Sequence, residues 1–167
     1  QMKRIKFPLP IIIHGDTSYI TAKKWKMEHF FMHQEFYTLI FDNMKQMNVV
    51  KDTTIDNVTV EKINLRKNSI KQYLFKRING QWMMTSIANI SINKSMNASF
   101  LKFYHHFAND SAFQVHSIND PLDFTGPNPD DDFSNMSGIL APEQWPSFAP
   151  ELPRDRIYNI IYGKTHP

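Results

Sequence analysis

The sequence predicts an α+β protein in which helices pack on a strongly curved antiparallel sheet. Two β-rich runs meet at Asn79-Gly80, the strongest short-range signal for a hairpin, because a type I′ turn needs positive φ at both central residues. An aromatic stripe at helical spacing follows this hairpin, and 41% hydrophobic residues can supply a core. We expect residues 1–97 to form a sheet-rich first half and residues 98–167 a second half that shares its core.

The predicted hairpin joins the run 69–78 to the run 81–92. A two-residue loop would set the register, with Ile78 opposite Gln81, Phe75 opposite Met84 and Tyr73 opposite Ser86. One face would carry Tyr73, Phe75, Trp82, Met84, Ala88 and Ile90, and the other Ile70, Leu74, Ile78, Met83 and Ile87. Because both faces are partly apolar, something should cover each of them.

The chain before the hairpin is less regular. Residues 1–15 have the composition of a strand, but Pro8 and Pro10 lack ladder donors and favour a sheet edge or an irregular start. The next segments are expected to be a loop or short helix near 20–28, a strand over 35–43 and polar turns over 44–57.

Two helices are predicted within residues 95–118. The aromatic side chains of one helical face fall at i, i+3, i+4 and i+7, namely Phe100, Phe103, Tyr104 and Phe107. Asn109, Asp110 and Ser111 offer a break and a new N-cap before a second, short helix. We expect the stripe to face the sheet. The proline-rich residues 119–156 should form a long loop or irregular lid, and residues 157–163 a closing strand.

A short pattern occurs twice in the chain with the same spacing. Gln1, Ile5, Pro8 and Leu9 recur as Gln114, Ile118, Pro121 and Leu122. A tryptophan and an aromatic β-rich run follow each copy, first Trp25 with 36–43 and then Trp145 with 157–164. This order favours an internal duplication over chance. The chain is then a trimmed piece of a longer protein, or its two halves supply each other's missing parts.

The quoted segments resemble a known family. A helix pair leading into a bent antiparallel sheet with a long Asn-Gly hairpin resembles the nuclear-transport-factor-2-like cone fold. The runs 1–9, 53–65, 73–87 and 107–124 look like an uncharacterised family of secreted gut-bacterial lipoproteins with that fold. The resemblance implies export, an extracytoplasmic location in the periplasm or cell envelope, and a lipid anchor upstream of Gln1. It supplies no catalytic residues.

Composition excludes several classes of function. The net charge of +3 comes from scattered lysines and arginines, which do not form the clustered footprint of a nucleic-acid-binding protein. The absence of cysteine excludes disulfides, thiolate catalysis and cysteine-ligated zinc. No glycine-rich phosphate loop or nucleophile-elbow motif occurs, and we expect no cofactor.

Two polar clusters are candidates for chemistry. His105 and His106 lie beside Asp110 on the predicted helix, and a histidine–aspartate pair suits proton transfer. Adjacent helical positions point about 100° apart, so at most one imidazole can face inward, and surface histidines are the favoured interpretation. Asp130-Asp131-Asp132 could hold calcium, but the spacing fits no EF-hand, and a solvated acidic loop is favoured. We expect no metal site.

Two functional hypotheses therefore remain. The first is a non-enzymatic extracytoplasmic binding or structural protein that holds a small apolar ligand in the cone. The expected lining residues are Tyr73, Phe75, Trp82, Phe103 and Phe107, although core packing explains the same side chains. The second is a dehydratase- or isomerase-like enzyme that uses the histidine–aspartate pair. Homodimers through open sheet edges at 1–13 and 157–163 are a further expectation.

Overall fold

The computed structural model describes residues 1–29, 40–41 and 44–164. Its contacts divide the chain into two compact units. The first comprises Gln1–Ala98 with Asp155–Pro167, and the second comprises Ser99–Arg154. The first boundary lies one residue from the predicted division after residue 97. The second boundary places the closing strand in the first unit.

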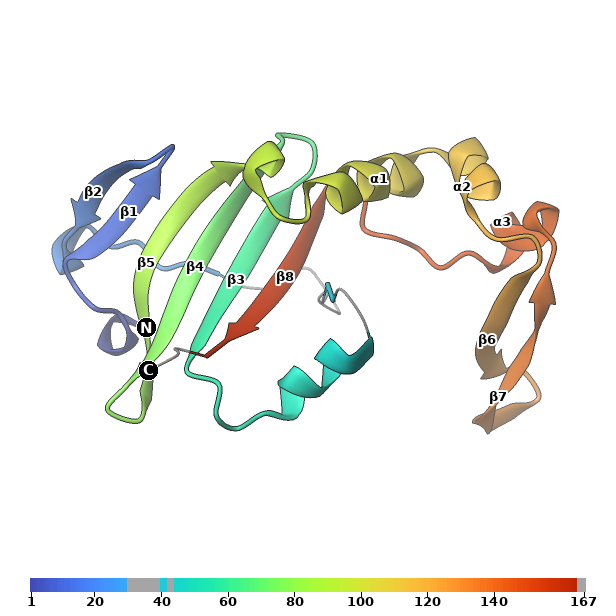
Figure 1. Ribbon diagram of the computed structural model, residues 1–167, viewed down its shortest axis with the longest axis horizontal. Coiled ribbons are helices and arrows are strands. Elements are labelled where there is room, and N and C mark those ends of the chain that lie inside the picture. The colour runs from blue at the N-terminus through green and yellow to red at the C-terminus, as the bar shows by residue number, and fades with distance from the viewer. Residues whose placement is uncertain (30–39, 42–43, 165–167) are drawn as a thin grey trace. The chain divides into compact units, whose positions relative to one another are not determined.

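Six strands of the described residues form one sheet in the first unit. In the order of the sheet its strands are β2 (Asp16–Ile20), β1 (Leu9–Ile13), β5 (Gln81–Ser91), β4 (Ser69–Ile78), β3 (Asn57–Asn64) and β8 (Arg156–Gly163) (Figure 1). Short 3-10 segments accompany them at Met2–Arg4, Ala22–Lys24, Met44–Lys51 and Ile92–Lys94. The fold is therefore α+β, as the sequence predicts.

The sheet is mixed rather than wholly antiparallel. Strand β1 runs parallel to β5, while every other neighbouring pair is antiparallel. Strand β1 pairs with β5 only from Ile11 onward, downstream of both prolines, so neither interrupts that ladder. Strand β2 covers the other side of β1 and forms this end of the sheet. The predicted open edge at residues 1–13 is therefore wrong.

The Asn79-Gly80 hairpin is confirmed. Both turn residues have positive φ, 51° and 76°, and the pairs Ile78–Gln81 and Phe75–Met84 form as predicted. The register then shifts between Leu74 and Phe75, so that Leu74 pairs with Ser86 and Tyr73 with Ile87. The predicted Tyr73–Ser86 pair is wrong because the irregularity gives β5 one extra residue, and an extra residue reverses the facing of every later side chain.

This shift moves three side chains to the opposite face from the one expected. Ile87 pairs with Tyr73 and lies on the Tyr73 face. Ala88 and Ile90, which pair with Gln72 and Ile70, lie on the other face. The Tyr73 face carries a buried hydrophobic cluster. It consists of Ile5, Leu9, Tyr73, Met84 and Ile87.

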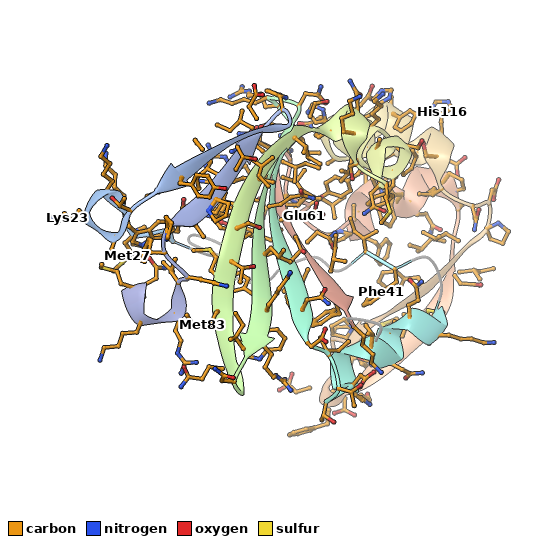
Figure 2. All side chains as sticks on the ribbon, turned by 60° about the vertical axis from the view of Figure 1, so that its left-hand side comes forward. Lys23, Met27, Phe41, Glu61, Met83 and His116 are labelled. Carbon is orange, nitrogen blue, oxygen red and sulfur yellow. The ribbon has the colours of Figure 1, made fainter. Side chains whose placement is uncertain are left out.

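A hydrogen-bonded polar group is buried on the other face. Glu61 is 2% exposed and Asn159 is 1% exposed. The Glu61 carboxyl oxygens accept hydrogen bonds from Gln72 Nε2 and Asn159 Nδ2, both at 2.9 Å, and Asn159 Oδ1 accepts one from the Ile40 amide. Figure 2 shows Glu61 in the middle of the sheet. The network joins strands β3, β4 and β8 by their side chains.

The segment between β1 and β3 differs in part from what the sequence predicts. Strand β2 begins before the region predicted as a loop or short helix near 20–28, which contains the 3-10 turn at Ala22–Lys24. The polar residues predicted as turns over 44–57 contain the 3-10 segment at Met44–Lys51. Most of the strand predicted over 35–43 lies outside the described residues.

The second unit contains the predicted helix pair. Helices α1 (Ala98–Asn109) and α2 (Ser111–Ser117) break at Asp110, whose side chain caps α2 by accepting a hydrogen bond from the Phe113 amide. The aromatic stripe has ring partners in its own unit. The Phe103 ring centroid lies 5.6 Å from that of Phe107 and 5.7 Å from that of Phe113. The expected packing of this stripe on the sheet stays a prediction.

The proline-rich segment is not an irregular loop. It forms an antiparallel ribbon of β6 (Leu122–Asn128) and β7 (Asp131–Leu140), followed by a 3-10 turn at Pro142–Gln144 and the short helix α3 (Trp145–Phe148). A proline such as Pro127 is tolerated because each strand of a two-stranded ribbon has an unpaired side, where a missing N–H costs no ladder bond.

Candidate functional site

Two lysines meet on the Tyr73 face of the sheet. Lys62 of β3 pairs directly with Lys71 of β4, so both side chains leave the sheet on the same side. Lys71 is two residues from Tyr73 and therefore shares its face. Like charges placed directly opposite each other on neighbouring strands are destabilising unless a counter-charge lies between them. The arrangement therefore calls for an acidic partner.

Glu28 provides this counter-charge. Its carboxylate lies 2.6 Å from Lys71 Nζ and 3.4 Å from Lys62 Nζ, and it accepts a hydrogen bond from Tyr73 Oη at 2.9 Å. Burial alone would raise the pKa of Glu28. The hydrogen bonds from Lys71 and Tyr73 and the charges of both lysines outweigh burial, and they hold the pKa below its ordinary value of 4.5. Glu28 is therefore ionised at neutral pH.

The side chain of Gln1 fixes the segment that carries Glu28. Its Oε1 accepts hydrogen bonds from Trp25 Nε1 at 3.2 Å and from the Glu28 amide at 3.1 Å, and its Nε2 donates to the Glu28 carbonyl at 3.0 Å. These three bonds hold both ends of residues 25–28. They set the position from which Glu28 reaches the lysines.

Tyr73 lies beneath this charge cluster. It is fully buried, and the ammonium groups of Lys62 and Lys71 lie 5.2 and 5.3 Å from the centroid of its ring. Burial raises the pKa of the Tyr73 hydroxyl, and the hydrogen bond to the Glu28 carboxylate raises it further. The hydroxyl is thus a fixed donor at neutral pH, and it positions Glu28.

A basic pocket opens beside the cluster, along β3, β4 and β8. It has a volume of about 470 Å³, within the ordinary range of roughly 300–1,000 Å³ for small-molecule sites. We call it the basic pocket. The cationic side chains that line it are Lys62, Lys67, Lys71 and Arg156, and the remaining lining residues are His29, Ile63, Asn64, Ser69, Asn89, Ile157 and Tyr158. None of the described lining side chains is acidic.

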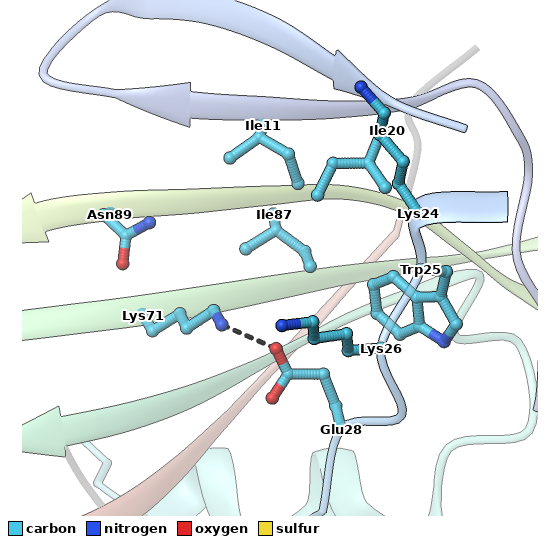
Figure 3. A pocket seen from close by; sticks show the side chains of 9 residues that line it. All are labelled: Ile11, Ile20, Lys24, Trp25, Lys26, Glu28, Lys71, Ile87 and Asn89. Atoms are coloured by element: carbon cyan, nitrogen blue, oxygen red, sulfur yellow. Dashed lines mark hydrogen bonds and ion pairs between the residues drawn. The ribbon is translucent and has the colours of Figure 1, made fainter. Parts of the chain in front are cut away.

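A smaller pocket of about 200 Å³ adjoins the first and shares Lys71 and Asn89 with it. We call it the Trp25 pocket. Figure 3 shows the apolar side chains of Ile11, Ile20 and Ile87 on one side of the Lys71–Glu28 ion pair. The indole of Trp25 lies at the end of the same hollow. The smaller pocket thus adds an apolar surface beside the basic pocket, and charged side chains line both pockets.

Comparison with known proteins places the chain in a family. The family described as "Domain of unknown function (DUF4348)" matches residues 1–167. The chain belongs to the DUF4348 family. It is also similar to an NTF2-like protein from Bacteroides fragilis NCTC 9343, with 41% identity and a TM-score of 0.84. The match covers 99% of this chain and 72% of that one, whose crystal structure was solved at 2.15 Å resolution. No curated protein matches the chain.

These matches confirm part of the resemblance inferred from the sequence. The DUF4348 chain has an NTF2-like α+β fold, its family has no assigned function, and a bacterial homologue exists. Within the described residues, no helix has the length and apolar character needed to cross a membrane.

The residues predicted to line an apolar cavity fall in both units. Tyr73, Phe75 and Trp82 lie on one face of the first unit, where Trp82 carries the Arg77 guanidinium 4.9 Å above its ring. Phe103 and Phe107 belong to the second unit and stack on each other. None of the five lines the basic pocket or the Trp25 pocket. Their predicted role stays a prediction.

The predicted histidine–aspartate pair forms on the surface of the second unit. His106 Nε2 lies 3.3 Å from an Asp110 carboxyl oxygen, and the side chains are 55% and 46% exposed. The imidazole of His106 stacks on Phe113 with the ring centroids 3.7 Å apart. Hydrogen bonds from the Phe113 amide and then from His106 lower the pKa of Asp110. His105 does not join the pair, and its carbonyl accepts a hydrogen bond from Asn109.

The acidic run at 130–132 lies in and beside the turn of the β6–β7 ribbon. Asp131 accepts a hydrogen bond from the Phe133 amide, which lowers the pKa of its carboxyl group. Across the described part of the chain, no three histidine, aspartate or glutamate side chains gather in a way that could hold a metal ion.

The basic pocket was not predicted from the sequence. Lys71 lies in the predicted strand over 69–78, but no register was predicted between that strand and the run that contains Lys62. A tight turn near Asn68, which has a φ of 55°, would have placed the two lysines opposite each other. That like-charge pair is the signal that could have led to Glu28.

Proposed function

We propose that this protein is a non-enzymatic binding protein that holds a small anionic ligand in the basic pocket. The observation that carries the proposal is the lining of the pocket: four cationic side chains converge on it, and no acidic side chain does among the described lining residues. This pocket is polar, in contrast to the apolar cone cavity expected from the sequence.

The chemistry of the lining favours an anion for physical reasons. Arginine presents a planar fork that matches the oxygens of a carboxylate or phosphate, and lysine supplies a compact charge on a flexible stem. Arg156 and Lys67 also line the pocket, and Lys62 and Lys71 pair with Glu28. Glu28 thus already places one carboxylate against Lys62 and Lys71, and the ligand would bring a second anionic group to the pocket.

Titration with citrate and inorganic phosphate, followed by NMR of the backbone amides, tests the proposal. We expect shifts concentrated on β3, β4 and β8. Lys67→Met and Arg156→Met should each weaken binding about tenfold, the equivalent of about 1.4 kcal/mol. Lys76→Met is the matched control, because Lys76 lies on β4 as Lys71 does but points to the other face. Equal losses in all three variants, or no shifts at all, would contradict the proposal.

The extracytoplasmic location is part of the same proposal. Its support is the resemblance to a family of exported lipoproteins, which implies an anchor upstream of Gln1. Fractionation of cells that express the natural gene, with antibody detection of the protein, provides the test. Recovery in the cytoplasmic fraction would contradict it.

An enzyme of the dehydratase or isomerase type is the second candidate function. The observation in its favour is the 3.3 Å contact between His106 and Asp110. The exposure of both side chains and the capping role of Asp110 favour the binding-protein hypothesis instead. If the enzyme hypothesis holds, His106→Gln should abolish turnover of a substrate identified by screening, whereas His116→Gln on α2 should not.

The internal duplication gains support from two corresponding hydrogen bonds. Trp25 Nε1 donates to Gln1 Oε1, and Trp145 Nε1 donates to Gln114 Oε1 at 2.9 Å. In each copy the glutamine precedes a two-stranded ribbon, a 3-10 turn and then the tryptophan. In a crystal structure, we expect the elements of residues 9–25 to superimpose in the same order on those of residues 122–145, with both glutamine–tryptophan hydrogen bonds present. A different element order would contradict the duplication.

Strong curvature of the sheet and homodimerisation are the remaining parts of the proposal. Strand β8 ends the sheet among the described strands, which supports pairing between copies along this strand. Light scattering over a range of protein concentrations tests this point. A molar mass that stays at that of one chain would contradict it.

A further inference from the structure

We infer that the ligand is an amphipathic anion whose charged group binds in the basic pocket and whose apolar part lies in the adjoining Trp25 pocket. This inference rests on the proposed function and names the class of ligand. The observation behind it is that two differently lined pockets share Lys71 and Asn89 as lining residues.

The two compartments differ in what they offer a ligand. Apart from Ile63 and Ile157, the basic pocket is lined by cations and polar side chains. The apolar part of the Trp25 pocket is formed by the indole of Trp25 with Ile11 and Ile20, beside the almost fully buried Ile87, as Figure 3 shows. Charged and polar side chains line the rest of it, namely Lys24, Lys26, Glu28, Lys71 and Asn89. Contact between these apolar side chains and apolar ligand atoms lowers the free energy of binding, because it removes both apolar surfaces from water. One end of the ligand is therefore anionic and the other is apolar.

The apolar compartment is preorganised. Gln1 holds Trp25 through its indole N–H, and it holds Glu28 by two further hydrogen bonds. Phe7 packs edge-on against the Trp25 ring with 6.2 Å between centroids, and Ile87 is 2% exposed in the core of the sheet. A wall fixed in this way loses little conformational freedom when a ligand binds, which improves affinity.

Charge sets the orientation of the ligand. Glu28 is the single acidic side chain lining the Trp25 pocket among its described residues, and it lies against Lys71 at the junction. An anion in the Trp25 pocket would meet this carboxylate beside three lysines, whereas the basic pocket offers four cationic side chains and no acidic one among its described lining residues. The exposed Lys24 and Lys26 also line the smaller pocket, so a cationic tail is disfavoured there.

A series of straight-chain carboxylates tests the inference. Acetate, butyrate, hexanoate and octanoate are titrated into the full chain by calorimetry at constant ionic strength. Complete burial of a methylene group is worth about a fourfold gain in affinity, so a two- to fourfold gain per added methylene is expected over the longer members. Heptyltrimethylammonium, which has the same seven-carbon tail and the opposite charge, should bind at least tenfold more weakly than octanoate.

Variants of the apolar wall separate the two compartments. Ile20→Ser and Ile11→Thr each remove apolar surface from the Trp25 pocket, and they should reduce octanoate affinity at least fivefold while leaving acetate binding unchanged. Ile13→Ser is the matched control, because Ile13 lies on β1 with Ile11 but does not line the pocket. Circular dichroism spectra check that each variant folds, and the chain-length series on the unmodified protein stands even if one does not.

The possible outcomes are distinguishable. If all the carboxylates bind equally, the apolar compartment is not used and this inference fails, while the anion-binding function stands. If octanol binds as well as octanoate and phosphate does not bind, the proposed function fails, and the inference of an amphipathic anion fails with it. Chain-length dependence that survives in Ile20→Ser and Ile11→Thr would place the tail elsewhere and overturn the inference.

Discussion

Replacement of Asn159 by leucine should strongly destabilise the first unit. The Asn159 side chain is 1% exposed and makes two hydrogen bonds, donating to Glu61 and accepting from the Ile40 amide at 3.2 Å. Leucine has a similar size but can do neither. The carboxyl group of Glu61, itself 2% exposed, would keep Gln72 as its side-chain donor. A buried carboxyl group deprived of a donor is costly because no water replaces the lost bond.

The magnitude follows from these two losses. The hydrogen bond to the Glu61 carboxyl group contributes about 1.5–3 kcal/mol, and the bond from the part-buried Ile40 amide contributes about 0.5–1.5 kcal/mol. Added apolar contacts of the leucine offset part of this. We therefore expect Asn159→Leu to lower the free energy of unfolding by about 3 kcal/mol, which for a chain of this length lowers the Tm by about 6–12 °C.

Urea unfolding followed by far-UV circular dichroism measures the effect, and the double variant Glu61→Leu/Asn159→Leu provides the decisive comparison. Removing both partners leaves no stranded carboxyl group, so the double variant should be about 1–2 kcal/mol more stable than Asn159→Leu alone. If Asn159→Leu changes the free energy of unfolding by less than 0.5 kcal/mol, or if the two substitutions add, the network does not have the role assigned to it here.

Two further predictions concern single residues. The pKa of Glu28 lies below 4.5 in the folded protein, so its stabilising contribution is present above that pH and is lost as the pH falls through the lowered pKa. The stability difference between the unmodified protein and Glu28→Gln should therefore be largest near neutral pH and vanish in acid, as thermal melts across pH can show; a difference independent of pH would contradict this. At the hairpin, Gly80 has a φ of +76° and open space around its missing Cβ, so Gly80→Ala should cost about 1–2 kcal/mol from the backbone alone. Gly138→Ala, which also meets open space but has no positive φ, should stay within about 0.5 kcal/mol in the same urea titration.

The elements that the sequence predicts well are those with strong local signals. Asn79-Gly80 determines its own turn because few residue pairs adopt positive φ at two consecutive positions, and Asp110 caps the start of the second helix with its own side chain. The register beyond Phe75 could not be predicted in this way. The extra residue in β5 involves no glycine, and Thr85, whose hydroxyl donates to the Leu74 carbonyl at 3.4 Å, is an ordinary strand residue.

The candidate site was harder to predict because its members are far apart in the chain and individually ordinary. Gln1, Glu28 and Lys71 lack any motif spacing, and each is the kind of residue that usually faces solvent. They meet because the chain segment after β2 crosses the Tyr73 face, and this crossing depends on tertiary packing around Trp25. The proline-rich region was misjudged for a different reason, since proline content argues against central strands but not against an isolated ribbon.

The return of β8 to the first unit has a consequence for how this protein can be cut and rejoined. The chain leaves the sheet after Ser91 and re-enters it at Arg156, and through the pairs Ser69–Ser91 and Asn64–Arg156 both points lie at the same end of the sheet. Three strand spacings separate them, about 14 Å. A linker of a few glycine and serine residues could span that distance. The segment between Ser91 and Arg156 can therefore be replaced by a short loop without changing the strand connections of the sheet.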